Sequence, residues 1–412
     1  MSTLNETPKG ERIHISLFGR RNVGKSSLIN AMTGQEVSIV SEVMGTTTDP
    51  VGKAMELLPL GPVYITDTPG LDVEGALGLM RIQRSYDILD KTDIAILVTD
   101  AATGIGAFEQ ALLKLVREKK IQIFVVFNKS DVSRVDDEAL KQTAEETQAP
   151  VFQVSSVTQE GVEEFKIALA KAVPEDADKF QLVGDLLSPS DFVVLVTPID
   201  KAAPKGRLIL PQQQTIRDIL EADAIAIVTK EFELRETLAQ LGKKPRLVIT
   251  DSQVFSKVAA DTPRDIPLTS FSILFARYKG DLPSLVRGAK AIDSLKDGDR
   301  ILMAEGCTHH RQSDDIGTVK IPRWLRQYTG KQLIFEHTAG MKYSSDLSQY
   351  ALIVHCGGCM LNRREMRYRI QQAGAKDVPI VNYGVLIAAV QGILARCLEP
   401  FPLAAMENEG AD

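Results

Sequence analysis

Two short segments in the last third of the sequence carry side chains that bind metals. Residues 307–309 read Cys-Thr-His, and residues 355–359 read His-Cys-Gly-Gly-Cys. Three of the 4 cysteines and three of the 5 histidines lie in these segments or directly beside them. Thiolates separated by two residues and joined by a distant Cys-x-His are typical of sites for zinc or an iron–sulfur cluster. The sequence therefore predicts a metal centre built from Cys307, His309, His355, Cys356 and Cys359.

The identity of the metal stays open at this point. Zinc would take three cysteines and one histidine in a closed tetrahedron. A four-iron cluster would take the three thiolates and leave one iron for a weak, exchangeable ligand. The remaining cysteine, Cys397, lies in an apolar stretch over residues 385–398, so we predict that it is part of the core.

A second chemical motif lies near the N-terminus. Residues 19–26 read Gly-Arg-Arg-Asn-Val-Gly-Lys-Ser, which matches the phosphate-loop pattern G-x-x-x-x-G-K-[ST] between a short apolar strand and a helix. Backbone N–H groups of such a loop wrap phosphates, the lysine contacts the β and γ phosphates, and the serine ligates Mg²⁺. The predicted nucleotide contacts here are Gly19, Asn22, Val23, Gly24, Lys25, Ser26 and Ser27.

Later segments complete a set of motifs for a guanine nucleotide. Thr47 lies in the polar segment 45–49, Gly-Thr-Thr-Thr-Asp, where a first switch and a second Mg²⁺ ligand are expected. Asp67 ends a strand and is followed by Thr-Pro-Gly, so Asp67 can hold Mg²⁺ through water and the Gly70 N–H can contact the γ phosphate. We therefore assign GTP hydrolysis to Lys25, Thr47, Asp67 and Gly70.

The base-binding motifs select GTP over ATP. Residues 128–131 read Asn-Lys-Ser-Asp and follow a buried strand predicted over 121–127. The Asp131 carboxylate is placed to accept two hydrogen bonds from the N1 and N2 groups of guanine, a donor pair that adenine lacks. The predicted base contacts are Asn128, Lys129, Asp131, Ser155 and Ser156.

Two positions differ from Ras-like GTPases and narrow down the class of GTPase to which this domain is similar. Leu71 occupies the position where those proteins keep a water-orienting glutamine, so intrinsic hydrolysis is expected to be slow. Asn22 matches the position where TrmE-Era-like GTPases, which this domain resembles, have an asparagine that helps to bind K⁺. That resemblance implies a K⁺ ion in place of an arginine finger.

The rest of the chain predicts further α/β structure. A proline- and charge-rich linker over 174–189 is followed by alternating strands and helices, and a third α/β segment begins near residue 265. We predict an N-terminal P-loop GTPase domain (1–174) and two further α/β domains with mostly parallel sheets (184–263 and 264–412). In the last domain, strands over 300–304, 333–336 and 351–354 would bring the cysteines to one sheet edge, where ligands of parallel sheets gather.

Four arginines, Arg363, Arg364, Arg367 and Arg369, lie on the helix predicted over 361–373, directly after the cysteines. They form either a solvated helix face or a site that attracts an anionic cargo. The net charge of -6 disfavours a general nucleic-acid binder. No apolar run is long enough for a membrane span, and cysteines at metal spacing are typical of a reducing cytoplasm. We expect a cytoplasmic protein without nucleic-acid or membrane partners.

The whole chain resembles the HydF family of GTPases, which help to mature FeFe-hydrogenases. That family joins a TrmE-Era-like G domain, a dimerisation domain and a cluster domain with the signature C-x-H…H-C-x-x-C, and residues 307–309 and 355–359 match the signature. The resemblance implies that Cys307, Cys356 and Cys359 hold a 4Fe–4S cluster, with His309 or His355 as a candidate fourth ligand.

The resemblance also implies a homodimer that binds GTP, GDP and Mg²⁺ and acts as a scaffold or carrier. It would receive a two-iron precursor made with the radical-SAM partners HydE and HydG and deliver it to apo FeFe-hydrogenase, with GTP as a timing device. The alternative is a zinc-containing TrmE-Era-like GTPase that acts in RNA modification or ribosome assembly.

Overall fold

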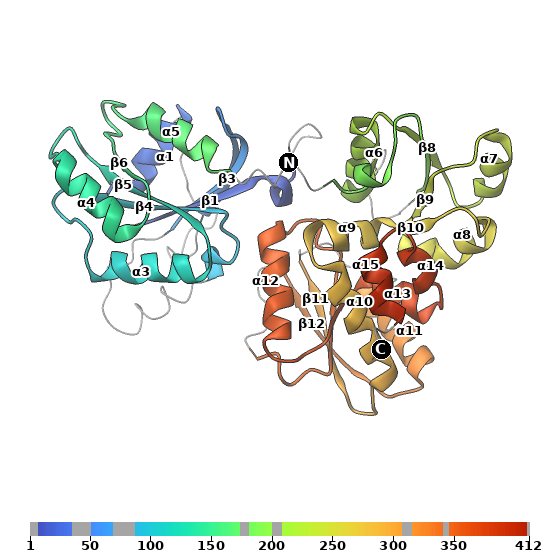
Figure 1. The fold of residues 1–412 in the computed structure, drawn as a ribbon. Helices are drawn as coiled ribbons and strands as arrows, with labels where there is room; N and C mark the ends of the chain where they lie inside the picture. Colours follow the sequence, from blue (N-terminus) through green and yellow to red (C-terminus); the bar gives the residue numbers. More distant parts are fainter. Residues whose placement is uncertain are drawn as a thin grey trace. The chain divides into compact units, whose positions relative to one another are not determined.

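The structure is a computed structural model that describes residues 7–34, 51–68, 87–173, 181–199, 208–306, 315–340 and 346–409. Thr47, Gly70, Leu71, Cys307 and His309 lie outside these ranges, so the predictions for them stay predictions. The chain forms two compact units, Met1–Ala177 and Asp178–Asp412 (Figure 1).

The first unit contains a six-stranded sheet in the order β2-β3-β1-β4-β5-β6. Its β2 strand runs antiparallel to β3, and the other neighbours are parallel. The strands are β1 (Ile13–Phe18), β2 (Val51–Leu57), β3 (Gly61–Asp67), β4 (Ile94–Asp100), β5 (Gln122–Asn128) and β6 (Val151–Gln153). The helices are α1 (Lys25–Thr33), α3 (Ala107–Glu118), α4 (Asp137–Thr147) and α5 (Val162–Lys171).

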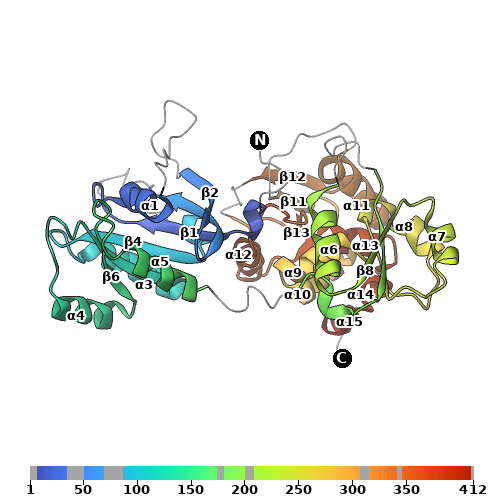
Figure 2. The same ribbon diagram turned by 90° about the horizontal axis from the view of Figure 1, so that it is seen from above.

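Helices cover both faces of this sheet, as the near-continuous apolar strands require. In β4, Ile94 and Ile96 pack into one core with α1 and α5, whereas Ala95 and Leu97 pack into a second core with α3. Figure 1 shows α1 and α5 on one side of the strands and α3 on the other, so that α5 and α3 overlap in the view from above in Figure 2. This arrangement places the carboxyl ends of β1, β3 and β5, which carry the nucleotide motifs, at one edge of the sheet.

The second unit contains two four-stranded parallel sheets, in the orders β10-β9-β7-β8 and β12-β11-β13-β14. The strands are β7 (Phe192–Val196), β8 (Ile225–Thr229), β9 (Leu247–Thr250), β10 (Leu268–Ser270), β11 (Arg300–Glu305), β12 (Ile334–Ala339), β13 (Leu352–His355) and β14 (Ile380–Asn382). The helices are α6 (Leu210–Glu221), α7 (Leu234–Gln240), α8 (Phe255–Asp261), α9 (Phe271–Lys279), α10 (Leu282–Lys290), α11 (Ile321–Thr329), α12 (Arg363–Gly374), α13 (Tyr383–Val390), α14 (Leu394–Leu398) and α15 (Pro402–Glu409).

The predicted fold class, a P-loop domain followed by mostly parallel α/β structure, is confirmed. Several local features of the second unit add to the sequence prediction. The edge strand β10 lies beyond the boundary predicted at residue 263, and one hydrophobic core includes residues of both sheets. His337 lies inside β12, opposite Met303, because parallel pairing with β11 extends that strand to Ala339. His355 is the last residue of β13.

Two further observations bear on the sequence predictions. Cys397 is 0% exposed, as expected of a core residue. Within the described ranges, no helix is long and apolar enough to cross a membrane.

Candidate functional site

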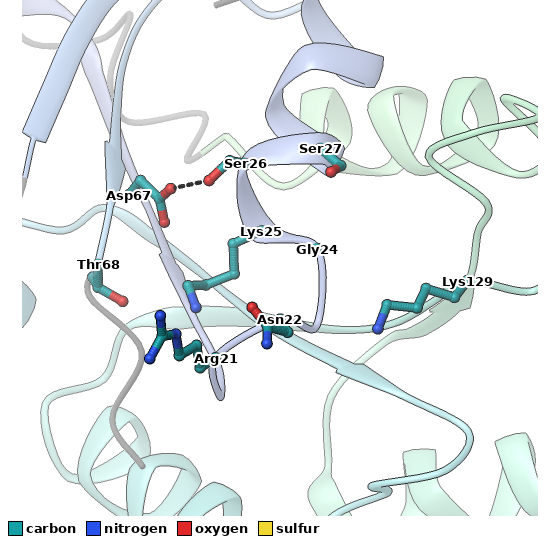
Figure 3. A pocket seen from close by; sticks show the side chains of 9 residues that line it. All are labelled: Arg21, Asn22, Gly24, Lys25, Ser26, Ser27, Asp67, Thr68 and Lys129. Atoms are coloured by element: carbon teal, nitrogen blue, oxygen red, sulfur yellow. Dashed lines mark hydrogen bonds between the residues drawn. The ribbon is translucent and has the colours of Figure 1, made fainter. Parts of the chain in front are cut away.

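The phosphate loop connects β1 to α1 and lines a pocket at the sheet edge (Figure 3). Two of its glycines are required by geometry. Gly19 has φ +148°, and a Cβ there would lie 2.2 Å from the Val98 carbonyl oxygen. Gly24 has φ +90°, and a Cβ there would lie 2.3 Å from Nδ2 of Asn128. A side chain at Gly19 would collide with the backbone of β4, and one at Gly24 would displace the Asn128 side chain.

The pocket is polar and rich in cationic groups. It is lined by Arg21, Asn22, Gly24, Lys25, Ser26, Ser27, Asp67, Thr68 and Lys129. Lys25 is 8% exposed, and its Nζ donates to the carbonyl oxygens of Gly19 and Arg20 at 3.0 and 2.8 Å. These bonds hold the ammonium group inside the loop, where a phosphate would meet it. In Figure 3, Lys129 lies across the pocket from Asp67.

Ser26 and Asp67 face each other, as two groups that share a Mg²⁺ ion should. The Ser26 hydroxyl donates to Oδ2 of Asp67 at 2.6 Å. Oδ1 of Asp67 is buried and has no hydrogen-bond partner among the described residues. Burial raises the pKa of Asp67, while the Ser26 hydrogen bond and the Lys25 charge act in the opposite direction. An unsatisfied buried carboxylate oxygen beside a serine hydroxyl fits a hard divalent cation.

On the base side of the site, Asn128 joins two loops. Its Nδ2 donates to the carbonyl oxygens of Val23 and Gly24 at 3.1 and 3.4 Å, and its Oδ1 accepts hydrogen bonds from the N–H and hydroxyl of Ser156. Asn128 therefore ties the phosphate loop to the base-binding turn. Asn128 therefore has a structural role in addition to the contact with the base that the motif predicts.

The other base-side residues are also held in place. The Ser155 hydroxyl donates to Oδ1 of Asp131 at 2.5 Å. Lys129 has a left-handed backbone with φ 64° and donates from Nζ to Asp100 at 3.1 Å. The arrangement presents the Asp131 carboxylate in one fixed orientation.

One ion pair at the phosphate loop was not predicted. Nε and Nη2 of Arg20 donate to Oε1 and Oε2 of Glu109 at 2.9 and 3.0 Å. Glu109 is 1% exposed and also accepts from the Gly106 N–H at 2.9 Å. The pair joins the loop to the first turn of α3. Because 89 positions separate the partners, no local pattern in the sequence indicates it.

The cysteine turn, residues 355–359, connects β13 to the segment before α12. Sγ of Cys356 accepts hydrogen bonds from the Gly306 N–H at 3.1 Å and the Gly358 N–H at 3.4 Å. Gly358 has φ +63°, which a glycine adopts without strain. Backbone N–H donors directed at a sulfur stabilise a thiolate, and Gly306 immediately precedes Cys307 in sequence.

The far end of the turn is anchored by a buried lysine. Lys279, at the end of α9, is 1% exposed, and its Nζ donates to the carbonyl oxygens of Cys359 and Leu361 at 3.0 and 2.9 Å. Burial raises the pKa of the Cys359 thiol, and the Lys279 charge opposes that effect.

His355 is placed differently from a solvent-facing ligand. It is 0% exposed, with Nδ1 2.8 Å from the Cys356 carbonyl oxygen and Nε2 3.1 Å from Nη1 of Arg369. A guanidinium only donates, so Nε2 accepts and Nδ1 carries the proton. Burial, together with the Arg369 charge, lowers the pKa of His355 to about 3. The prediction of His355 as a ligand remains a prediction, and in this geometry both of its nitrogens contact protein groups.

The position of Arg369 agrees neither with a solvated helix face nor with a site for an anionic cargo. Arg369 is 1% exposed and donates to Oε1 of Glu365 at 2.8 Å and to the Gly340 carbonyl oxygen at 3.0 Å. It is therefore neither on a solvated face nor available to a cargo. The described residues, which do not include Cys307 and His309, contain no cluster of three or more metal-binding side chains.

Parts of the chain match four known families. Residues 14–129 match the 50S ribosome-binding GTPase family, and residues 82–227 match the elongation factor Tu GTP-binding domain. Residues 182–280 match the hydrogen maturase F dimerization domain, and residues 283–400 match the hydrogen maturase F tetramerization domain.

Two curated relatives each match less than half of the chain. The chain is 35% identical over 163 residues to a tRNA modification GTPase MnmE of Thiobacillus denitrificans, covering 39% of this chain and 34% of that protein. It is 35% identical over 127 residues to a GTPase Der of Kosmotoga olearia, covering 30% and 28%. The chain thus spans about a third of the length of the curated relatives it matches.

Two solved structures are similar to part of the chain. The G domain of the T. maritima FeoB iron transporter aligns with 25% identity and a TM-score of 0.31, over 39% of this chain and 98% of that one. Aquifex aeolicus Era aligns with 18% identity and a TM-score of 0.34, over 56% and 98%.

The family matches confirm the GTPase prediction, including the binding of GTP, GDP and Mg²⁺. Two hydrogen maturase F domains follow the GTPase domain and together extend from residue 182 to residue 400. The matches to a dimerization and a tetramerization domain also confirm that the chain has domains for oligomerization. With this succession of domains, the chain belongs to the hydrogen maturase F (HydF) family of GTPases.

Proposed function

We propose that this GTPase holds a 4Fe–4S cluster at Cys307, Cys356 and Cys359 and acts as a scaffold or carrier in hydrogenase maturation. The observation that carries the proposal is the cysteine turn, in which Cys356 Sγ accepts two backbone N–H bonds, one of them from the residue that precedes Cys307. The cargo is a two-iron precursor made with HydE- and HydG-type radical-SAM partners and delivered to apo FeFe-hydrogenase.

The donor set of the turn fits an iron–sulfur cluster. N–H bonds to sulfur and partly buried thiols are the environment that such clusters use. When bound, the cluster supplies an iron that the three thiolates leave open to an exchangeable ligand. The protein's part is to orient Cys356 and Cys359 and to shield them from water. His309 and His355 stay candidates for the fourth ligand, and His355 would have to give up its hydrogen bond from Arg369 to bind iron through Nε2.

GTP acts as a switch in this proposal. The phosphate loop and Asp67 hold the nucleotide and Mg²⁺, and the segments 45–49 and 67–71 respond to the γ phosphate. If this is right, Lys25→Ala abolishes GTP binding and, with it, hydrogenase maturation in a coupled activity assay. Normal maturation by a variant that binds no GTP would exclude the switch.

Hydrolysis is proposed to be slow and K⁺-stimulated. Asn22 has a left-handed backbone with φ 63° and lines the phosphate pocket, where its side-chain oxygen can contribute to a K⁺ site. The test compares hydrolysis in equal concentrations of KCl and NaCl for the wild type and Asn22→Ala. Stimulation by K⁺ that Asn22→Ala loses supports the proposal, and equal rates in both salts contradict it.

The cluster is tested by anaerobic reconstitution with iron and sulfide, followed by electron paramagnetic resonance after reduction. A four-iron signal in the wild type that Cys356→Ser loses is expected. Stoichiometric zinc without such a signal would favour the zinc-containing GTPase instead. Similarity to tRNA modification GTPases is confined to the G domain, which many GTPases share, and gives that alternative no independent support.

A further inference from the structure

The cysteine turn is held at both ends by buried cationic side chains from two different helices. Lys279 comes from α9 and Arg369 from α12, and these helices pack against each other. Both side chains are 1% exposed. A buried cation is costly unless its donors are used, so two of them beneath one short turn need an explanation.

Lys279 fixes the carboxyl end of the turn. Its Nζ donates to the carbonyl oxygens of Cys359 and Leu361. These carbonyls lie between the second cysteine and the start of α12, so the lysine sets the path of the chain that carries Cys359. It also places a positive charge close enough to act on the Cys359 sulfur.

Arg369 fixes the amino end of the turn through His355. Nη1 of Arg369 donates to Nε2 of His355, whose Nδ1–H donates to the carbonyl oxygen of Cys356. Nη2 of Arg369 is held by Glu365 and by the Gly340 carbonyl oxygen. The orientation of the Cys356 peptide therefore depends on a chain of buried hydrogen bonds that begins on α12.

We infer that Lys279 and Arg369 are positioning residues that fix the two ends of the cysteine turn before any metal binds. His355 is the connection between Arg369 and the Cys356 backbone. This inference rests on the proposed function, because it assumes that the turn holds an iron–sulfur cluster. A fixed turn holds the thiols in their binding geometry, so less ordering is needed when the cluster enters.

The Lys279 charge has a second consequence. A bound cluster with its thiolates is anionic and gains a further negative charge on reduction. Net charge and hydrogen bonding near a cluster set its reduction potential. Removing Lys279 should therefore make the cluster harder to reduce, whereas a residue that only stabilises the fold would leave the potential unchanged.

The test uses the full-length chain, reconstituted anaerobically with iron and sulfide, and the variants Lys279→Met and Lys279→Arg. We measure iron and sulfide content, the midpoint potential by electron paramagnetic resonance titration, and the rate of iron loss to a chelator. The expected result for Lys279→Met is a more negative potential and iron loss at least several-fold faster than in the wild type. Lys279→Arg should restore both, since it keeps the charge and can donate to both carbonyls.

Arg396→Met is the matched control. Arg396 is 6% exposed and also donates to backbone carbonyls, those of Ala259, Thr262 and Pro263, each at 2.8 Å. It holds a different loop of the same unit. The control should lose thermal stability and keep the wild-type potential. If Lys279→Met does not fold, Lys279→Gln, which keeps an N–H donor without the charge, takes its place.

The outcomes separate the inference from the proposed function. A wild type that takes up no iron and sulfide overturns both. A wild type with a cluster, and a folded Lys279→Met with the same potential and chelation rate, overturns the inference alone. The inference is supported if Lys279→Met changes the potential and the rate of iron loss, Lys279→Arg restores both, and Arg396→Met keeps the wild-type potential.

Discussion

The hydroxyl of Ser155 donates a 2.5 Å hydrogen bond to Oδ1 of Asp131, so one turn fixes the carboxylate that is predicted to select the base. Asp131→Asn replaces an acceptor with an amide that donates. The variant should lose about 10- to 100-fold in GTP affinity, because two charge-assisted hydrogen bonds to guanine are lost. It should gain affinity for xanthosine triphosphate, which carries a carbonyl at position 2. Titration with fluorescent analogues of both nucleotides checks this, and unchanged GTP affinity would contradict the assignment.

The facing pair of Ser26 and Asp67 predicts a pH-dependent Mg²⁺ site. Because burial raises the pKa of Asp67, the empty site binds a proton at a higher pH than an ordinary aspartate does. Above that pKa, Mg²⁺ affinity should be constant. Below it, affinity should fall by up to about tenfold per pH unit as protons compete.

Mg²⁺ titration of the GDP-bound protein at several pH values measures this effect. Ser26→Ala should raise the Mg²⁺ concentration for half-maximal hydrolysis by about tenfold or more, since one metal ligand is lost. Wild-type Mg²⁺ dependence in Ser26→Ala would show that this hydroxyl does not ligate the ion.

The ion pair between Arg20 and Glu109 predicts a stability effect in the first unit. Glu109→Gln leaves the guanidinium without its charged partner and should lower the free energy of unfolding by about 2 kcal/mol, less than for a fully buried pair because Arg20 is partly exposed. The Lys25-binding carbonyl of Arg20 should also become less fixed, which weakens GTP binding. Chemical unfolding and nucleotide titration measure both effects.

The control for Glu109→Gln is Glu163→Gln. Glu163 pairs with Lys166 but is 67% exposed, so its substitution should change stability by less than about 0.5 kcal/mol. Equal effects of the two substitutions would contradict a specific role for the buried pair.

The nucleotide site could be predicted from the sequence because each of its motifs is a short run of consecutive residues. Gly19 to Ser26 form one loop, and the carboxyl ends of parallel strands bring Asp67 and Asp131 to the same edge. The sequence did not predict which arginine of α12 is buried. Arg369 and Arg367 are two positions apart, and only packing against neighbouring elements decides that the first is enclosed and the second exposed. The Arg20–Glu109 pair escaped prediction for the same reason, as it depends on the placement of α3.

Cys397 should be chemically inert in the folded protein. Burial raises its pKa from 9.0 to about 12, an effect that the Arg396 charge opposes. At pH 8 this shift makes the thiolate fraction about a thousandfold smaller than at the ordinary pKa, so alkylation should be slower by a similar factor. Mass spectrometry after iodoacetamide treatment, native and in urea, measures it. Labelling at similar rates in both conditions would show that the site opens readily.

The exposed edge of the sheet β10-β9-β7-β8 leads to a prediction of how two copies of the chain associate. Among the described strands β8 ends this sheet, and it exposes Ile225 and Val228, which are 42% and 47% accessible. An apolar edge strand is a pairing surface, and it lies in the segment that matches the dimerization domain. Val228→Lys should therefore weaken self-association at least tenfold, as measured by sedimentation equilibrium. Ile167→Lys, at a position 43% exposed on α5, is the control and should leave association unchanged. If Val228→Lys associates like the wild type, the dimer forms through another surface.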